Sequence, residues 1–190
     1  MNRYYIAIEG IDGSGKSTTI KRLQSKYNDS IDLYQRTHKP AWIMPFMNNR
    51  FFKKCQLVQI PVYLFLAHYN YWDFLKHDRQ NRIVIMDRCF LTNICYFFPS
   101  ALSKKSFRKA LIKLEPSIIP NKVYVLDVDP VEAWERDNHS KDLGWLTKTR
   151  NAYIQAGILN DYEVEIIPQM ADIDGPSLYI ASIIDEIIKK

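Results

Sequence analysis

One short segment near the N-terminus limits the folds available to this chain more than any other feature. Residues 10–17 read Gly-Ile-Asp-Gly-Ser-Gly-Lys-Ser, which matches the pattern G-x-x-x-x-G-K-[ST] in full. An apolar run at residues 4–8 precedes the segment, and an amphipathic stretch at residues 16–27 follows it. The pattern therefore predicts a strand, a tight loop and a helix N-terminus, an arrangement that surrounds a phosphate with backbone N–H groups.

Each position of this loop has an expected role. We expect Lys16 to reach the β- and γ-phosphate oxygens of ATP and Ser17 to ligate Mg²⁺. The predicted ATP-binding residues are Gly10, Asp12, Gly13, Ser14, Gly15, Lys16, Ser17 and Thr18. The alternative is a glycine turn that happens to precede a lysine, and the flanking strand, the flanking helix and Ser17 weigh against it.

The rest of the chain repeats the alternation of strand and helix. Apolar runs at residues 4–8, 83–86, 123–126 and 164–167 read as buried parallel strands, and a weaker fifth run ends near Arg36. Helical patterns occupy residues 16–27, 104–114, 131–136, 145–155 and 176–188. A further helix is expected to start with Pro61 in its first turn and to end near residue 77.

This order of elements predicts an α/β fold with three layers, in which helices flank a five-stranded parallel sheet, as in P-loop NTPases. Without repeats or a linker, the 190 residues are expected to form one domain, 1–190, with 47% apolar and 25% charged residues. The formal charge of +5 comes from basic residues scattered among 21 acidic ones. We therefore expect no nucleic-acid partner.

The cysteines and one uncharged stretch bear on the setting of the protein. Cys55, Cys89 and Cys95 form neither an even disulfide framework nor a pair of zinc-binding Cys-x-x-Cys elements, which favours a reduced, cytoplasmic protein. Residues 55–72 contain no Asp, Glu, Lys or Arg. Gln56, Pro61 and other residues interrupt the stretch, so we expect a buried or cleft-lining helix and no membrane association.

The loop alone does not name the reaction, because switches, motors and kinases share it. A GTPase would carry an Asn-Lys-x-Asp motif after a late strand. The Asn-Lys pair of this chain is Asn121-Lys122, and Tyr124 stands where that motif has aspartate. The match to the GTPase motif therefore fails.

Four segments together resemble the thymidylate kinase family of nucleoside monophosphate kinases. Residues 8–18 resemble its loop pattern E-G-x-D-G-x-G-K-S-T, and residues 84–88 resemble its strand with an Asp-Arg pair. Residues 126–136 resemble the late strand that leads into the lid, and Arg150-x-x-Tyr153 resembles the helix after it. The resemblance implies ATP-dependent phosphorylation of a nucleoside monophosphate, Mg²⁺ as cofactor and a homodimer.

The resemblance also implies roles for individual residues. Asp87 would organise Mg²⁺ or its waters, and Arg88 would bridge the donor and acceptor phosphates, which suits a planar guanidinium; a structural salt bridge is the alternative. The acceptor-binding residues that it implies are Asp12, Arg36, Phe65, Tyr69, Arg88 and Tyr96. Of these, Arg36 would contact the acceptor phosphate, Phe65 would stack on the base, and Asp12 and Tyr96 would lie near the sugar.

Two departures from the family pattern bear on which base the acceptor carries. Tyr69 stands where the family has an arginine that reads the thymine edge, and Phe97 stands where glutamine is frequent. Loss of polar readers is expected to change or loosen base choice. Members of the family carry their transition-state cation either in the loop or in the lid. Because Ser14 is uncharged, the resemblance implies that the lid at about residues 136–143 supplies it, and among Arg136, His139 and Lys141 we expect Arg136 to do so.

Two other activities stay open at this point. A deoxynucleoside kinase would need a carboxylate base, for which Glu9 and Asp87 are the candidates. A nucleotide-binding switch would signal through loop order, and the Asp87-Arg88 pair and the lid-like segment weigh against it.

Overall fold

The protein is described by a computed structural model that covers residues 3–35, 40–49, 56–76, 81–97, 118–158 and 163–189. In this part of the chain, five parallel strands form one sheet in the order β2-β3-β1-β4-β5. They are β1 (Tyr4–Glu9), β2 (Ile31–Gln35), β3 (Ile83–Asp87), β4 (Lys122–Leu126) and β5 (Val164–Ile167). The five-stranded parallel sheet predicted from the sequence is confirmed.

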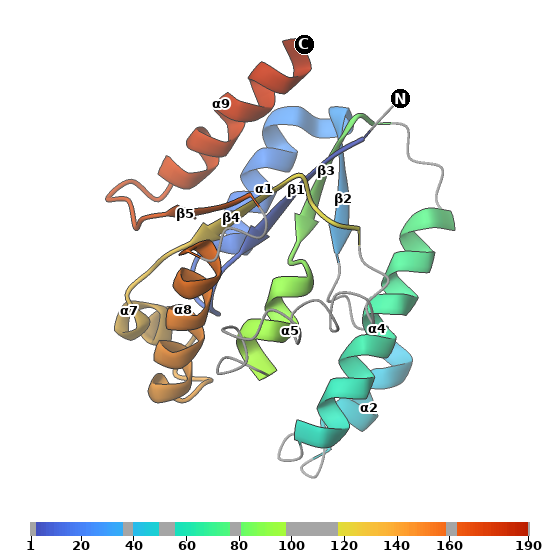
Figure 1. The fold of residues 1–190 in the computed structure, drawn as a ribbon, viewed down its shortest axis with the longest axis vertical. Coiled ribbons are helices and arrows are strands. Elements are labelled where there is room, and N and C mark those ends of the chain that lie inside the picture. Colours follow the sequence, from blue (N-terminus) through green and yellow to red (C-terminus); the bar gives the residue numbers. More distant parts are fainter. Residues whose placement is uncertain are drawn as a thin grey trace.

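Helices cover both faces of the sheet (Figure 1). The longer ones are α1 (Lys16–Tyr27), α4 (Gln56–Lys76), α5 (Phe90–Phe97), α7 (Pro130–Arg136), α8 (Leu143–Ile158) and α9 (Gly175–Lys189). Shorter turns are η1 (Asn28–Ser30), η2 (Ala41–Ile43) and α2 (Met44–Met47). The helix predicted at residues 104–114 lies outside the described residues.

The two faces of the sheet bury separate clusters of apolar side chains because successive strand residues point to opposite sides. In β1, Ile6 and Ile8 pack with α1 and α9, whereas Ala7 points to the opposite face, where α5 and α8 pack. Helix α4 lies beside the β2 edge of the sheet (Figure 1). It packs there through Phe74, whose ring centroid lies 5.0 Å from that of Tyr34. The predicted three-layer architecture is confirmed, and it brings the carboxyl ends of all five strands to one edge.

Some element boundaries differ from the prediction. Helix α4 begins at Gln56, so Pro61 lies inside it and not in its first turn. Because proline has no backbone N–H, the helix lacks one hydrogen bond there. Helix α5 was not predicted, because its eight residues are short for a periodicity signal. Its buried residues Phe90, Leu91, Ile94 and Cys95 obtain their order from tertiary packing. Within the described residues, no helix is long and apolar enough to span a membrane.

Candidate active site

The loop between β1 and α1 has the backbone that a phosphate-binding loop needs. Gly13 and Gly15 have φ angles of 80° and 89°, a region that favours glycine. A Cβ atom at Gly13 would overlap the backbone of Ala133 in α7. Glycine is therefore required at this position both by the turn and by the close approach of α7.

Lys16 lies inside this loop with only 7% of its surface exposed. Its Nζ donates to the Ile11 carbonyl oxygen at 2.7 Å and to Ser14 Oγ at 3.3 Å. Burial, and then the nearby Arg88 cation, lower the pKa of Lys16 to about 7. The amine is thus held at the head of the loop with its charge poorly compensated, which is the state that an anionic phosphate would stabilise.

Arg88 faces the loop from the end of β3. It has a left-handed backbone with φ 72°, and its backbone N–H donates to the Ile8 carbonyl at 3.2 Å. Its guanidinium donates from Nη2 to Asp12 Oδ1 at 2.6 Å and from Nη1 to the Tyr96 hydroxyl at 3.0 Å. The Tyr96 hydroxyl donates to the same Asp12 oxygen at 3.1 Å. Asp12, which lies 76 residues before Arg88 and 84 before Tyr96, therefore forms one cluster with them.

Burial and neighbouring charges shift the pKa values of two carboxyl groups here, those of Asp12 and Asp87. Burial works to raise the pKa of Asp12, but the cations of Arg88, Lys16 and Lys141 outweigh burial and lower it. For Asp87, burial dominates and raises the pKa, although Arg88 and Lys16 oppose the rise. Asp12 is consequently a stable anion that orients Arg88, whereas Asp87 is a carboxylate that lacks full charge compensation.

A cavity of about 550 Å³ runs from the loop along the carboxyl edge of the sheet. Six predicted ATP-binding residues besides Lys16 line it together with Asp87, Arg88 and Arg136; these six are Asp12, Gly13, Ser14, Gly15, Ser17 and Thr18. The segment after β5 forms a further wall through Pro168, Gln169, Met170, Asp172 and Ile173. Sequence reasoning missed this segment, although ligands of open α/β sheets bind beyond the carboxyl ends of the strands.

Glu9, the last residue of β1, is fully buried, and three uncharged groups donate to it. The donors are the Cys89 backbone N–H at 2.7 Å, the Thr92 hydroxyl at 2.8 Å and the Tyr153 hydroxyl at 2.8 Å. Thr92 belongs to α5 and Tyr153 to α8. The carboxylate therefore joins the loop, the start of α5 and the helix after the lid, and it is not placed to act as a base.

Arg136, the lid residue that we expected to supply the transition-state cation, is the last residue of α7. Arg136 forms an ion pair with Glu132, one helical turn earlier, and Gln169 donates to the same carboxylate. Farther along, Arg150 donates from Nε and Nη2 to the two oxygens of Asp127, at 2.6 and 2.8 Å. This bidentate pair fastens α8 to the end of β4.

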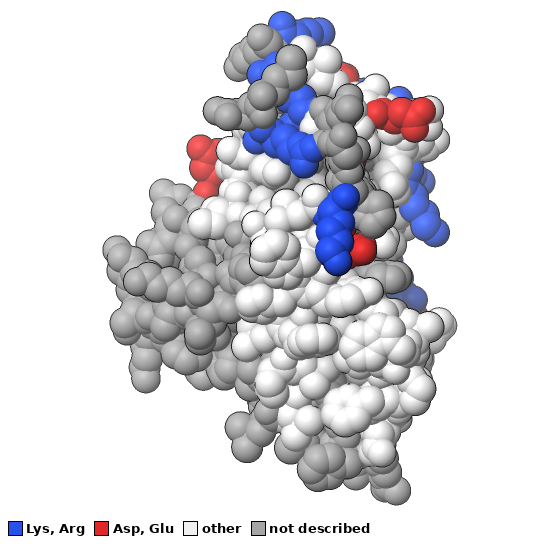
Figure 2. Space-filling model, turned by 90° about the vertical axis from the view of Figure 1, so that its right-hand side faces the viewer, with Lys and Arg blue, Asp and Glu red and all other residues white. Residues whose placement is uncertain are grey.

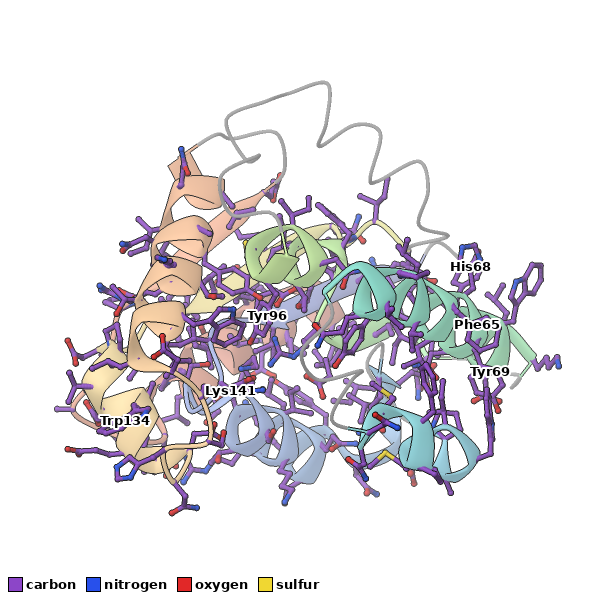
Figure 3. All side chains as sticks on the ribbon, turned by 90° about the horizontal axis from the view of Figure 1, so that it is seen from below. Phe65, His68, Tyr69, Tyr96, Trp134 and Lys141 are labelled. Atoms are coloured by element: carbon purple, nitrogen blue, oxygen red, sulfur yellow. The ribbon has the colours of Figure 1, made fainter. Side chains whose placement is uncertain are left out.

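The residues of α4 divide between two sides of the helix. Phe65 and Tyr69 are 51% and 39% exposed, each with its ring centroid 6.2 Å from that of Trp42. Figure 3 shows both residues apart from Tyr96, on the far side of α4. An apolar pocket of about 360 Å³ lies there, lined by Trp42, Ile43, Phe46, Pro61, Val62 and Phe65.

Tyr63 lies on the inner side of α4 and was missed by sequence reasoning. Burial raises the pKa of its hydroxyl, and the charge of Asp12 raises it further, so Tyr63 lies near enough to the Arg88 cluster to sense it. The buried positions Leu66, Ala67 and Asn70 follow at helical spacing and could have indicated this inner face. Arg36 and the side chain of Phe97 lie outside the described residues.

The site combines a phosphate loop at the carboxyl edge of a parallel sheet with an arginine that Asp12 and Tyr96 hold in place, and a helical turn closes one side of it. This arrangement defines a P-loop phosphotransferase. The sequence model of the thymidylate kinase family matches residues 8–167. The chain belongs to the thymidylate kinase family, and its activity is the ATP-dependent phosphorylation of a nucleoside monophosphate. The family and the class of enzyme predicted from the sequence are thereby confirmed.

Individual relatives agree with this assignment. The chain is 30% identical to a probable thymidylate kinase of Pyrobaculum aerophilum, over 84% of this chain and 86% of the relative. It is 26% identical to a thymidylate kinase of Sulfurimonas denitrificans, over 90% of this chain and 94% of the relative. The crystal structure of a thymidylate kinase from Ehrlichia chaffeensis superposes with a TM-score of 0.68 at 20% identity, over 97% of this chain and all of that one, which shows the shared fold.

Proposed function

We propose that the protein transfers the γ-phosphoryl group of ATP to the phosphate of a deoxynucleoside monophosphate, and that dTMP is one of several acceptors. The observation that carries this proposal is the clamp on Arg88: Asp12 and Tyr96 hold its guanidinium over the head of the phosphate loop. A planar cation in that place can bind donor and acceptor phosphates together.

The proposed chemistry rests on positioning and charge neutralisation. Phosphoryl transfer spreads negative charge over the oxygens of the transferred group, and preorganised cations stabilise it without rearrangement. Lys16 and Arg88 supply two such cations. A phosphate acceptor needs no strong base, and the engagement of Glu9 with Cys89, Thr92 and Tyr153 supports a monophosphate over a nucleoside hydroxyl as acceptor.

Ser17 and Asp87 would hold Mg²⁺ in this proposal. Both line the cavity beside Lys16, and the raised pKa of Asp87 reflects a buried carboxylate that a cation would compensate. A hydroxyl and a carboxylate oxygen suit Mg²⁺, which takes its other ligands from phosphates and water. Bound there, the ion would neutralise phosphate charge on ATP.

For the acceptor base we propose a weakly selective site on the inner side of α4, beside Tyr63, which lies near Asp12 and Arg88. Aromatic faces stack on every base, so this ring offers contact without strong base choice. Phe65 and Tyr69 contact Trp42 on the outer side of α4, and their expected roles toward the base stay predictions. Arg36, outside the described residues, keeps its predicted role on the acceptor phosphate.

We further propose a homodimer that forms through the outer face of α4. Trp72 and Leu75 are 59% and 46% exposed, and Figure 2 shows a largely uncharged surface over this part of the molecule. Exposed apolar patches of this kind commonly mark protein interfaces. Sedimentation of the wild type and of Trp72→Glu tests this point, with a monomeric variant as the expected result.

The single domain of residues 1–190, with a lid at about 136–143, and the cytoplasmic setting stay predictions.

The experiment that tests the function is a measurement of ADP release from ATP with a panel of nucleosides and monophosphates. We expect turnover with dTMP and other deoxynucleoside monophosphates, and none with nucleosides. Turnover with thymidine would favour a nucleoside kinase, and ADP release that no acceptor accelerates would favour a switch.

A further inference from the structure

The two cations of the lid lie in different surroundings. Arg136 is paired with Glu132, which also accepts from Gln169 of the segment after β5, and Arg136 lines the cavity beside Asp137. Lys141 has no carboxylate of the described residues within ion-pair distance. Since a paired guanidinium must first give up its partner, the unpaired ammonium is the more available cation for a phosphate.

Hydrogen bonds and a ring contact support the backbone that carries Lys141. Asn138 and His139 both have left-handed φ angles, of 49° and 58°. The His139 backbone N–H donates to the Trp134 carbonyl at 3.0 Å, and the ring of His139 stacks on Trp134 with centroids 3.8 Å apart. The indole N–H of Trp134 then donates to the Lys141 carbonyl at 2.9 Å. Trp134 thus sets where the chain turns at Lys141.

The side chain of Lys141 points from this turn toward the Arg88 cluster. Its Nζ lies 5.7 Å from the ring centroid of Trp145, and Trp145 meets the ring of Tyr96 edge to face at 4.9 Å. Tyr96 in turn donates to Asp12. In the view of Figure 3, Lys141 lies close to Tyr96. The positive charge of Lys141 is also among those that lower the pKa of Asp12.

From this geometry we propose that Lys141, and not Arg136, is the catalytic cation of the lid and contacts the transferring phosphoryl group. The proposal rests on the proposed function. Ser14 is uncharged, so a third cation beside Lys16 and Arg88 would come from the lid. The contact with Trp145 orients the ammonium by a cation–π interaction and leaves its three N–H donors available to phosphate oxygens. Arg136 then serves the donor nucleotide.

The test compares Lys141→Ala, Lys141→Arg and Arg136→Ala in steady-state kinetics, with Lys148→Ala on the exposed side of α8 as the matched control. Lys141→Ala is expected to lower kcat by about 10²- to 10³-fold, with both KM values nearly unchanged. Lys141→Arg should recover part of the loss, and Arg136→Ala should raise the KM for ATP more than it lowers kcat. A kcat of Lys141→Ala within two-fold of wild type would overturn the proposal.

A second measurement separates this proposal from the function on which it rests. Titration calorimetry of ADP with aluminium fluoride, with and without dTMP, reports binding of a mimic of the transferring phosphoryl group. We expect Lys141→Ala to weaken this complex at least ten-fold and to bind ADP alone as the wild type does. If the wild type phosphorylates no monophosphate, the proposed function fails, and equal affinities of the two proteins for the mimic would refute the role of Lys141.

Discussion

The phosphate end of the candidate site and the aromatic region on the outer side of α4 are built on different physical principles. At the phosphate end, Lys16, Arg88 and Asp12 are largely buried, and hydrogen bonds of 2.6 to 3.3 Å fix their positions. In the aromatic region formed by α2 and α4, Phe65 and Trp42 are about half exposed and meet through ring edges alone.

This difference separates catalysis from selectivity. Charged groups act best when they are preorganised, because reorganisation would cost part of the stabilisation they provide. Apolar contact is nearly indifferent to direction and discriminates weakly between bases. We therefore expect changes at the phosphate end to alter rate or stability strongly, and changes in the aromatic region to alter substrate choice modestly.

The largest effect is expected from Lys16→Ala. Its amine stabilises charge that grows during transfer, so we expect kcat to fall by more than about 10³-fold while the fold is retained. Steady-state ADP release, with circular dichroism to check the fold, measures this. A variant that keeps a tenth of wild-type turnover would contradict the role of the loop.

Next in size is the effect of Glu9→Gln on stability. The amide keeps the shape but loses the charge that accepts from Cys89, Thr92 and Tyr153. Hydrogen bonds to charged groups contribute about 1.5–3 kcal/mol each, so we expect a loss of about 2 kcal/mol in the free energy of unfolding. Urea denaturation measures it, with Glu186→Gln on the exposed side of α9 as control. Equal stability of the two variants would show that the network around Glu9 is dispensable.

In the aromatic region, Tyr69→Arg tests the prediction that position 69 takes part in base choice. One good polar contact is equivalent to roughly ten-fold in affinity, so we expect kcat/KM for dTMP to rise about ten-fold relative to dCMP and dAMP. Competition kinetics over the four deoxynucleoside monophosphates measures this, with Tyr69→Phe as the control that keeps the ring. If the wild type already prefers dTMP by about 1,000-fold, a residue other than Tyr69 reads the base.

The smallest effect is a proton taken up when ATP binds. Lys16 has a pKa lowered to about 7 in the free protein, below its value in the unfolded chain, so its amine is largely neutral above that pH. Phosphates favour the charged amine. ATP binding near pH 8.5 should therefore take up a fraction of a proton through Lys16, and binding at pH 6 should not. Calorimetry in buffers of different ionisation enthalpy measures the uptake, which Lys16→Met should abolish.

The sequence by itself determined the parts of this protein that depend on local backbone chemistry. Gly13, Gly15 and Lys16 specify the loop wherever a strand precedes it and a helix follows it, because the glycines supply left-handed turns within a few residues. Alternating apolar runs specified the parallel sheet, and Asp87-Arg88 followed from its place at the end of a strand. The family resemblance came from the same local motifs.

Only the tertiary structure decided which side chains meet. Asp12, Arg88 and Tyr96 come from a loop, a strand end and a helix, and helix α5 itself is too short for its pattern to reveal. Residues two apart in a helix point to nearly opposite sides, and packing decided that the side of α4 with Tyr63 faces inward and the side with Phe65 faces outward. In the lid, it paired Arg136 with Glu132 and directed Lys141 toward Trp145. Such contacts depend on long-range packing and desolvation, which no local pattern encodes.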